Sequence, residues 1–167
     1  MATTPRDLLL YELGIARDSE RTGRIMVGRI RDLISNEDLI ETLRCIEDQS
    51  ERHLAHVGNC LQALGSAPLE TPSETVNGIS GRFEAFTRLQ PTCELLELFA
   101  LSTVRLFLGF GISTAKSVLT LARLMGETQC ADQVQETLAQ KEETLRNLER
   151  VGDNLTQRIV RSVPAAS

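Results

Sequence analysis

The chain has 167 residues, 41% of them hydrophobic, and a formal net charge of −5. A chain of this size can bury one substantial core, and no shift in composition indicates a second domain. Lys and Arg are scattered among the acidic residues, so no basic surface is predicted for nucleic acid or for an anionic membrane. We therefore expect one soluble domain that binds neither.

The N-terminal segment MATTPRDLLLYELG has no basic region followed by an apolar stretch and a cleavage site, so no signal peptide is predicted. Charged residues interrupt every long apolar stretch, so no membrane span is predicted. The four cysteines, Cys45, Cys60, Cys93 and Cys130, show no metal-ligand spacing and are expected to be reduced thiols that pack in the protein. A cytoplasmic protein fits these features.

Capping signals divide the chain into helices. The first helix is predicted to begin at TPRD, where Thr4 can cap and Asp7 completes a capping box. The second is predicted to begin at SNED, with Ser35 and Asp38 in the same relation, and to end at the glycine of ALG. The predicted long helices cover residues 5–34, 35–65, 92–125 and 130–160, and a short helix follows TPSE within 71–89.

Four helices of similar length, with short first and last connections and one long crossover, are typical of a ferritin-like four-helix bundle. The predicted fold is therefore all-α, with the short extra helix carried on the crossover. We expect residues 1–160 to form this single bundle and residues 161–167, which include SVPAAS, to be a disordered tail.

Each long helix carries a line of apolar residues spaced three or four apart, which should face the bundle axis. The polar residues on these lines near mid-length are Glu20, Ser50, His53 and Lys141. In the segment EDQSERHLAH, His53 lies on the line, whereas His56 and the neighbouring acids are expected mostly at the surface.

Four segments, on the first, second and fourth long helices and on the crossover, carry a resemblance to a known family: LLLYELGIARDSERTGRI, HLAHVGNCLQALG, SETVNGISGRFEA and CADQVQETLAQKEETLRNL. Together they resemble the YciE/YciF family of ferritin-like bacterial stress proteins, over about residues 5–155. The resemblance implies a stress association and a dinuclear metal site, and it carries two ligands over to this chain, Glu20 and His53.

The chain departs from that family at the other ligand positions. It has DQS before the histidine, Leu108 and Gly111 on the third long helix, and Gln140 and Lys141 where paired glutamates are implied. A carboxylate-bridged pair of hard cations needs about four carboxylates. We therefore expect a degenerate metal centre, with no cofactor bound.

Two alternatives remain open at this centre. Locally bent helices could turn further acids inward and form a site for a single Zn, Fe or Mn ion; these acids are Glu47, Glu51, Glu142 and Glu143. Lys141 could pair with Glu20 in place of a metal, with Ser50 and His53 completing the hydrogen bonds, or it could extend to the surface along its aliphatic stem.

The third long helix is apolar nearly all round, which indicates a second surface that it buries. The apolar residues expected off its core line are Leu106, Phe107, Phe110, Ile112 and Leu119. The short helix, with Phe83 and Phe86, or a second subunit could cover them. We expect a homodimer formed through the third long helix and the crossover helix.

No nucleophile–base pair or cofactor motif is visible, so a non-catalytic structural or binding protein is favoured over an enzyme, without excluding one. The alternative is a metal-binding ferritin-like oxidase or storage protein that uses a reduced site.

Overall fold

A computed structural model describes residues 3–67 and 70–162 of the chain. Its helices are α1 (Pro5–Arg31), α2 (Glu37–Ala63), α3 (Glu74–Thr87), α4 (Cys93–Leu124) and α5 (Thr128–Ser162). Within the described ranges there is no strand. The predicted all-α fold, with four long helices and a short one on the crossover, is confirmed.

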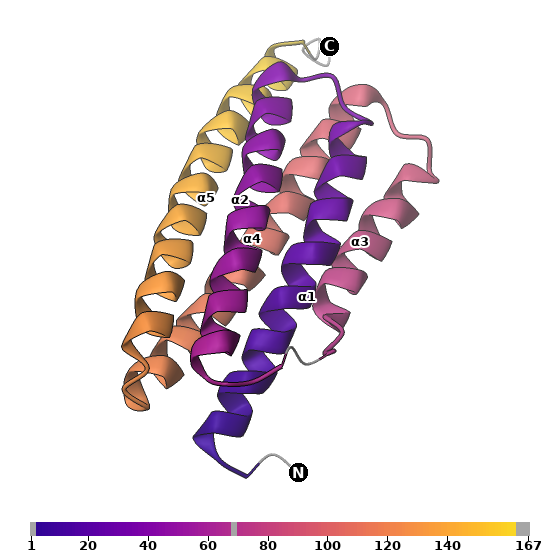
Figure 1. Ribbon diagram of the computed structural model, residues 1–167. Helices are drawn as coiled ribbons and strands as arrows, with labels where there is room; N and C mark the ends of the chain where they lie inside the picture. The colour runs from indigo at the N-terminus through magenta and orange to yellow at the C-terminus, as the bar shows by residue number, and fades with distance from the viewer. Residues whose placement is uncertain (1–2, 68–69, 163–167) are drawn as a thin grey trace.

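The four long helices form an antiparallel bundle (Figure 1). Helix α1 packs beside α2 and α4, and α5 packs beside the same two helices, so α1 and α5 face each other across the diagonal. The crossover from α2 to α4 returns the chain to the opposite end of the bundle, and its helix α3 packs on α4 and α1. This is the topology of a ferritin-like bundle.

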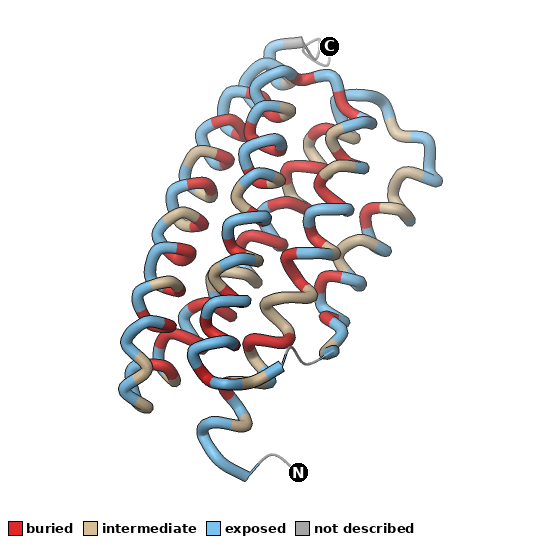
Figure 2. The backbone as a smooth tube through the Cα atoms, in the orientation of Figure 1, coloured by how far each residue is buried: buried red, intermediate tan, exposed pale blue. Residues whose placement is uncertain are grey.

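Buried residues follow the inner faces of the long helices (Figure 2). The predicted core lines are confirmed, because nearly all of their members are buried and the remainder are half-buried. The apolar core falls into two clusters. The α3-side cluster includes Val27, Ile30, Leu43, Val104 and Phe107 together with Val76 and Phe83 of α3, and the second cluster includes Leu9, Leu13, Val57, Val118 and Leu138.

The predicted caps are correct for α1 and wrong for α2. Thr4 and Asp7 form the capping box of α1. Helix α2 is capped by Asn36, whose side chain accepts a hydrogen bond from Leu39 N, and not by Ser35. The Ser35 hydroxyl and backbone N–H both donate to Glu97 Oε1 of α4, each over 3.0 Å. The Ser35 side chain therefore bonds to a residue of another helix instead of capping α2, as the sequence pattern had predicted.

The crossover is held on the bundle by polar and aromatic contacts. Ser73, the cap of α3, accepts a hydrogen bond from Ser19 Oγ over 2.9 Å, and its backbone N–H donates to Asp18 Oδ2 over 2.7 Å. Further along α3, the rings of Phe83 and Phe86 stack on Phe99 of α4, at centroid distances of 6.3 and 4.1 Å. These contacts let α3 cover the first half of α4.

Helix α4 is, by length and composition alone, apolar enough to cross a membrane, and no other helix in the described part of the chain is. Its position in the bundle gives another reason for this composition, because it packs against α1, α3 and α5. Of the residues off its predicted core line, Phe107 and Leu119 are buried within the chain, whereas Leu106 is 44% exposed.

Helix α5 continues to Ser162, two residues beyond the predicted end of the bundle. Residues 163–167 of the predicted disordered tail lie outside the described residues.

Candidate functional site

The four polar residues of the predicted core lines are all buried. Glu20 comes from α1, Ser50 and His53 from α2, and Lys141 from α5, and each replaces an apolar residue in the repeat of its helix. Because α1 and α5 face each other across the diagonal, the charges of Glu20 and Lys141 meet near the bundle axis. The sequence prediction that these side chains gather in one layer is confirmed for Glu20, His53 and Lys141.

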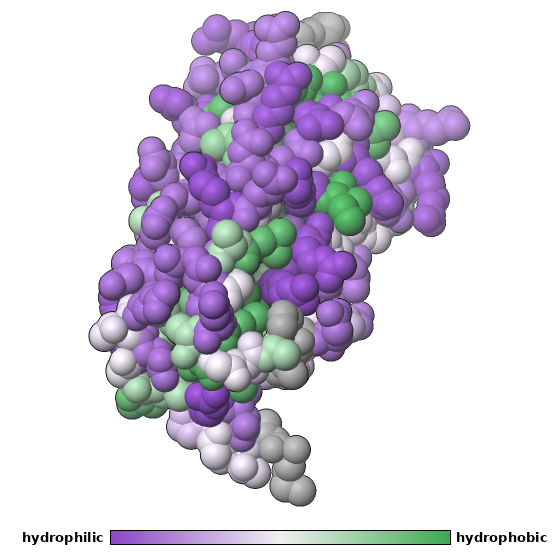
Figure 3. Space-filling model, viewed as in Figure 1, coloured by the Kyte–Doolittle hydropathy of each residue, from purple (hydrophilic) through white to green (hydrophobic). Residues whose placement is uncertain are grey.

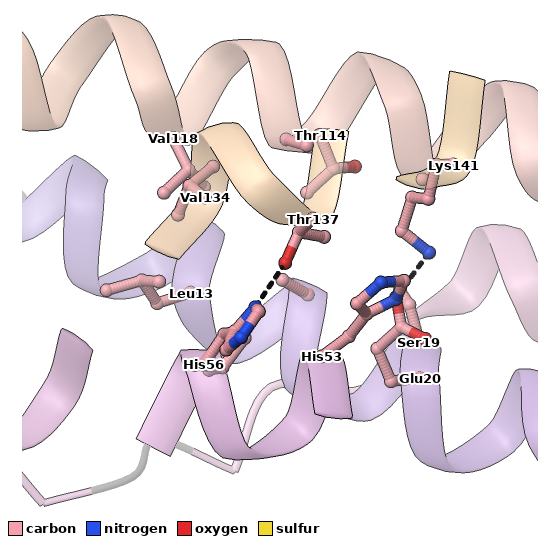
Figure 4. A pocket seen from close by; sticks show the side chains of 14 residues that line it. Leu13, Ser19, Glu20, His53, His56, Thr114, Val118, Val134, Thr137 and Lys141 are labelled. Carbon is pink, nitrogen blue, oxygen red and sulfur yellow. Dashed lines mark hydrogen bonds and ion pairs between the residues drawn. The ribbon is translucent and has the colours of Figure 1, made fainter. Parts of the chain in front are cut away.

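Lys141 and Glu20 form a buried ion pair, with Lys141 Nζ 2.6 Å from Glu20 Oε1 (Figure 4). Their side chains are 5% and 7% exposed, so Lys141 does not extend to the surface. Gly111 of α4 makes room for this lysine, because a Cβ at that position would lie 3.1 Å from Nζ. The ring of Phe107 lies 5.6 Å from the ammonium, within the range of a cation–π interaction.

Burial alone would raise the pKa of Glu20, since it removes water from the carboxylate. The positive charge of Lys141 beside the carboxylate outweighs this effect and lowers the pKa to about 2. The carboxylate is therefore ionised at neutral pH and is neutralised by the ammonium beside it.

His53 is oriented by α5. Gln140 donates from Nε2 to Glu136 Oε1 over 3.1 Å, so its Oε1 is left as the acceptor that faces His53 Nε2 at 3.1 Å. This assigns the imidazole proton to Nε2. The other ring nitrogen, Nδ1, lies 3.6 Å from Glu20 Oε1, with no hydrogen-bond partner in the described structure.

Ser50 is buried, but no hydrogen bond joins it to Glu20, His53 or Lys141 in the described part of the chain. The expected role of Ser50 in completing the charged layer is therefore wrong. Glu20 Oε2, like His53 Nδ1, is buried without a hydrogen-bond partner among the described residues. Two buried polar atoms of this layer therefore lack a hydrogen-bond partner among the described residues.

A small cavity of about 30 Å³ adjoins the charged layer. Glu20, His53 and Lys141 line one part of it, and apolar residues of the second core cluster, such as Leu13 and Val118, line the rest. Figure 4 shows these side chains around the cavity. Its volume suits one or two water molecules and no larger ligand.

His56 also lines the cavity, and the prediction that it is a surface residue was wrong. It is half-buried, and its Nδ1 lies 2.8 Å from Thr137 Oγ1 of α5 (Figure 4). One helical turn separates it from His53, so both imidazoles face α5. The sequence pattern assigned His56 to the surface because it considered only burial toward the bundle axis. The flank of α2 that carries His56 is also covered, by α5.

Further polar side chains join α2 and α5. Besides the two histidine contacts, hydrogen bonds between side chains link Asn59 to Gln133, Thr144 to Gln49 and Asn147 to Thr42. The face seen in Figure 3, which includes α1, α2 and α5, is likewise mainly hydrophilic, with separated apolar patches.

The additional acids considered as ligands lie away from the charged layer. Three of them have cationic partners outside it: Glu47 pairs with Arg31, Glu51 with Arg24 and Glu142 with Lys116. The fourth, Glu143, is exposed. None of them lines the cavity beside Glu20.

The residues of this layer do not fit a ferritin-type dinuclear metal centre. Such a centre draws four glutamates and two histidines from the four helices. Here Glu20 and His53 are the acid and imidazole of the layer, and the ammonium of Lys141 lies 2.6 Å from the carboxylate that would bind the cations. No group of three or more potential ligands occurs in the described residues.

The fold is that of a ferritin-like four-helix bundle, with a buried charged layer at its centre. Residues 4–161 match the protein family described as a domain of unknown function, DUF892, and the chain belongs to this family.

Two solved structures are similar to the chain at 14% sequence identity. The Escherichia coli stress protein YciF has a TM-score of 0.88, with 93% of this chain and 98% of that chain covered. YcfI from Rhodopseudomonas palustris, for which a structural role has been suggested, has a TM-score of 0.85, with 89% and 94% covered. The comparison with curated proteins finds no match.

Sequence reasoning missed two residues that orient the site. Gln140 was noted only as a departure from the family, yet it sets the tautomer of His53. Thr137 lies three residues before it on the same flank of α5 and holds His56. The spacing of these residues matches that of His53 and His56 on α2, which is the signal that could have paired them.

Proposed function

We propose that this protein is a non-catalytic structural bundle of the stress-protein type, in which an internal ion pair stands in place of a metal centre. The observation that carries the proposal is the 2.6 Å contact between Lys141 Nζ and Glu20 Oε1, with both side chains buried. An ammonium supplies the positive charge that cations supply to a carboxylate cluster. It cannot bind or reduce oxygen, so the centre has a structural role.

The two similar structures support the biological setting of this proposal. YciF is described as a stress protein, and a structural role has been suggested for YcfI. The acidic composition and the four unbridged cysteines fit a reducing cytoplasm.

A metal-binding or oxidase function that uses a reduced site is the second candidate. Its support is that Glu20 Oε2 and His53 Nδ1 are buried beside the cavity without partners among the described residues. The ammonium of Lys141 argues against this candidate, because it lies beside these atoms and would repel a cation. A metal ion at these atoms would require Lys141 to move away.

Metal analysis of the purified protein separates the two candidates. We expect iron, manganese and zinc all well below one equivalent per chain, also after incubation with each metal and desalting. Stoichiometric metal that disappears in Glu20→Ala, but remains in the surface control Glu51→Ala, would contradict the ion-pair proposal and support the second candidate.

We also propose that the protein forms a homodimer through α4 and α3. The support is an apolar surface near the middle of α4, where Leu106 is exposed and Phe110 and Ile112 are half-buried. The aromatic contacts of helix α3 lie closer to the start of α4, at Phe99.

Light scattering of the wild type and of two charge variants tests the dimer. Leu106→Glu should give a monomer, whereas Val160→Glu, near the C-terminal end of α5, should leave a dimer because Val160 is also exposed to solvent and lies outside the proposed interface. A wild type that is monomeric at tens of micromolar would contradict the dimer.

A further inference from the structure

Two of the four cysteines lie together inside the bundle. Cys60 is 0% exposed and Cys130 is 1% exposed, and the Cys60 thiol donates a hydrogen bond to the backbone carbonyl of Cys130 over 3.7 Å. Cys60 is in the last turn of α2 and Cys130 in the first turn of α5. These helix ends meet at the same end of the bundle (Figure 1).

We propose that Cys60 and Cys130 are a peroxide-sensitive oxidation site, in which an intramolecular disulfide joins the end of α2 to the start of α5. The site is separate from the charged layer, and the proposal does not depend on the function proposed above.

The surroundings assign different roles to the two thiols. Cys130 is the third residue of α5, where the positive end of the helix dipole favours a thiolate. Its interaction with the Cys60 thiol lowers the pKa of Cys130, against the opposing effects of burial and of Glu127. The same interaction, together with burial, raises the pKa of Cys60. Cys130 is therefore the attacking thiol, and Cys60 is the resolving thiol.

The reaction balances with a peroxide as the oxidant. The Cys130 thiolate attacks one oxygen of hydrogen peroxide, the O–O bond breaks, and the other oxygen leaves as hydroxide, which takes up a proton to give water and a sulfenic acid. Cys60 then loses its proton and attacks the Cys130 sulfur. The S–O bond breaks, a second water leaves, and the two thiols have lost two electrons to the peroxide.

The position of the pair at two helix ends provides access for a small oxidant. The terminal turns of helices open at a lower free energy than their centres, so a small peroxide reaches Cys130 without unfolding of the bundle. The remaining cysteines, Cys45 and Cys93, are exposed and have hydrogen bonds with Gln49 and Ser35 rather than with a second thiol. Only the buried pair is placed for a crosslink within the chain.

The test uses the full chain with Cys45→Ser and Cys93→Ser, so that only the buried pair remains. After the folded protein is treated with hydrogen peroxide, we expect a mass lower by two hydrogen atoms and a linked peptide that contains Cys60 and Cys130. A thiol reductant should reverse both. The crosslink closes a long loop, so the melting temperature should rise by about 5 °C or more.

Two single variants in this background test the assigned roles. Cys60→Ser should stop at a sulfenic acid on Cys130 that dimedone traps, and Cys130→Ser should give no trapped product. Alanine replaces serine wherever circular dichroism shows that the serine variant fails to fold. A crosslink that forms only in denaturant, no crosslink at all, or dimedone trapped on Cys60 would overturn the proposal.

Discussion

The two halves of the hydrophobic core are packed differently, although the same four helices run through both. In the α3-side cluster, α3 adds Val76 and Phe83, and helices approach closely at glycines. A Cβ at Gly23 would lie 2.2 Å from the ring of Phe107, and one at Gly152 would lie 2.6 Å from Leu101. The second cluster has no residue of α3, and the cavity of about 30 Å³ lies at its edge.

This difference shows where the bundle tolerates a charge. The ion pair of Glu20 and Lys141 lies where the tightly packed half meets the cavity, and Gly111 leaves room for the lysine there. A large aromatic residue, Phe107, closes the other side.

The largest effect is expected when one partner of the buried pair is removed. Lys141→Ala leaves the Glu20 carboxylate buried without a cation, so the free energy of unfolding should fall by about 3–5 kcal/mol. Lys141→Met combined with Glu20→Leu removes both charges and should be near wild type. Equilibrium unfolding in urea measures these values, and small, additive losses for the single changes Lys141→Met and Glu20→Leu would contradict a coupled pair.

Acid should also weaken the ion pair of Glu20 and Lys141. The pKa of Glu20 is lowered from 4.5 to about 2 in the folded protein, so its contribution to stability is complete above about pH 4.5 and is lost as the pH falls toward 2. The loss should be on the order of 3 kcal/mol. The double variant Glu20→Leu, Lys141→Met should lack this component, and an identical pH dependence of the two unfolding free energies would show that the pair is not its source.

In the α3-side half, a single methyl group should be poorly tolerated. Gly23→Ala places a carbon against the Phe107 ring and should cost about 3 kcal/mol, although alanine favours helices. The matched control is Gly58→Ala on α2, where nothing beyond the adjoining residues and backbone of the same helix lies within 4 Å of the new carbon, and it should stabilise the protein by about 0.5–1 kcal/mol. Thermal unfolding of both variants measures the contrast, which disappears if Phe107 rotates away without cost.

The smallest expected effect compares two buried valines of α4. Val118 lines the cavity, so Val118→Ile should fill space and stabilise the protein by about 0.8 kcal/mol. Val104 belongs to the α3-side cluster, where the same added methylene should cost about 1 kcal/mol or more. Denaturant unfolding of the pair measures both, and equal effects would mean that the two halves are packed alike.

The number of helices, their order and most of their inner faces follow from the sequence. Cap signals and a repeat of three or four residues are local properties. Each long helix shows the repeat, and α1, α2 and α4 also begin at a capping residue. The same repeat put Glu20, His53 and Lys141 in one layer, because helices of equal length in a bundle bring residues at similar depth together. This much of the candidate site was predictable.

The partners of residues on the flanks of the helices were decided by the tertiary structure. His56 and Phe107 lie off the predicted core lines, but neighbouring helices cover them. Ser35 donates a hydrogen bond to Glu97 of another helix instead of capping α2 as predicted. Periodicity in one helix reports which side faces the bundle axis and not how far the adjacent helices wrap around it.

The choice between an ion pair and an extended lysine also belongs to the tertiary structure. The sequence places Lys141 on the core line, but its four-carbon stem could reach either Glu20 or the solvent. Gly111 of another helix provides the space that lets the ammonium stay inside, 2.6 Å from the carboxylate. Cys60 and Cys130 likewise show no motif in the sequence, and they become neighbours only because α2 and α5 run antiparallel and bring distant parts of the chain to one end of the bundle.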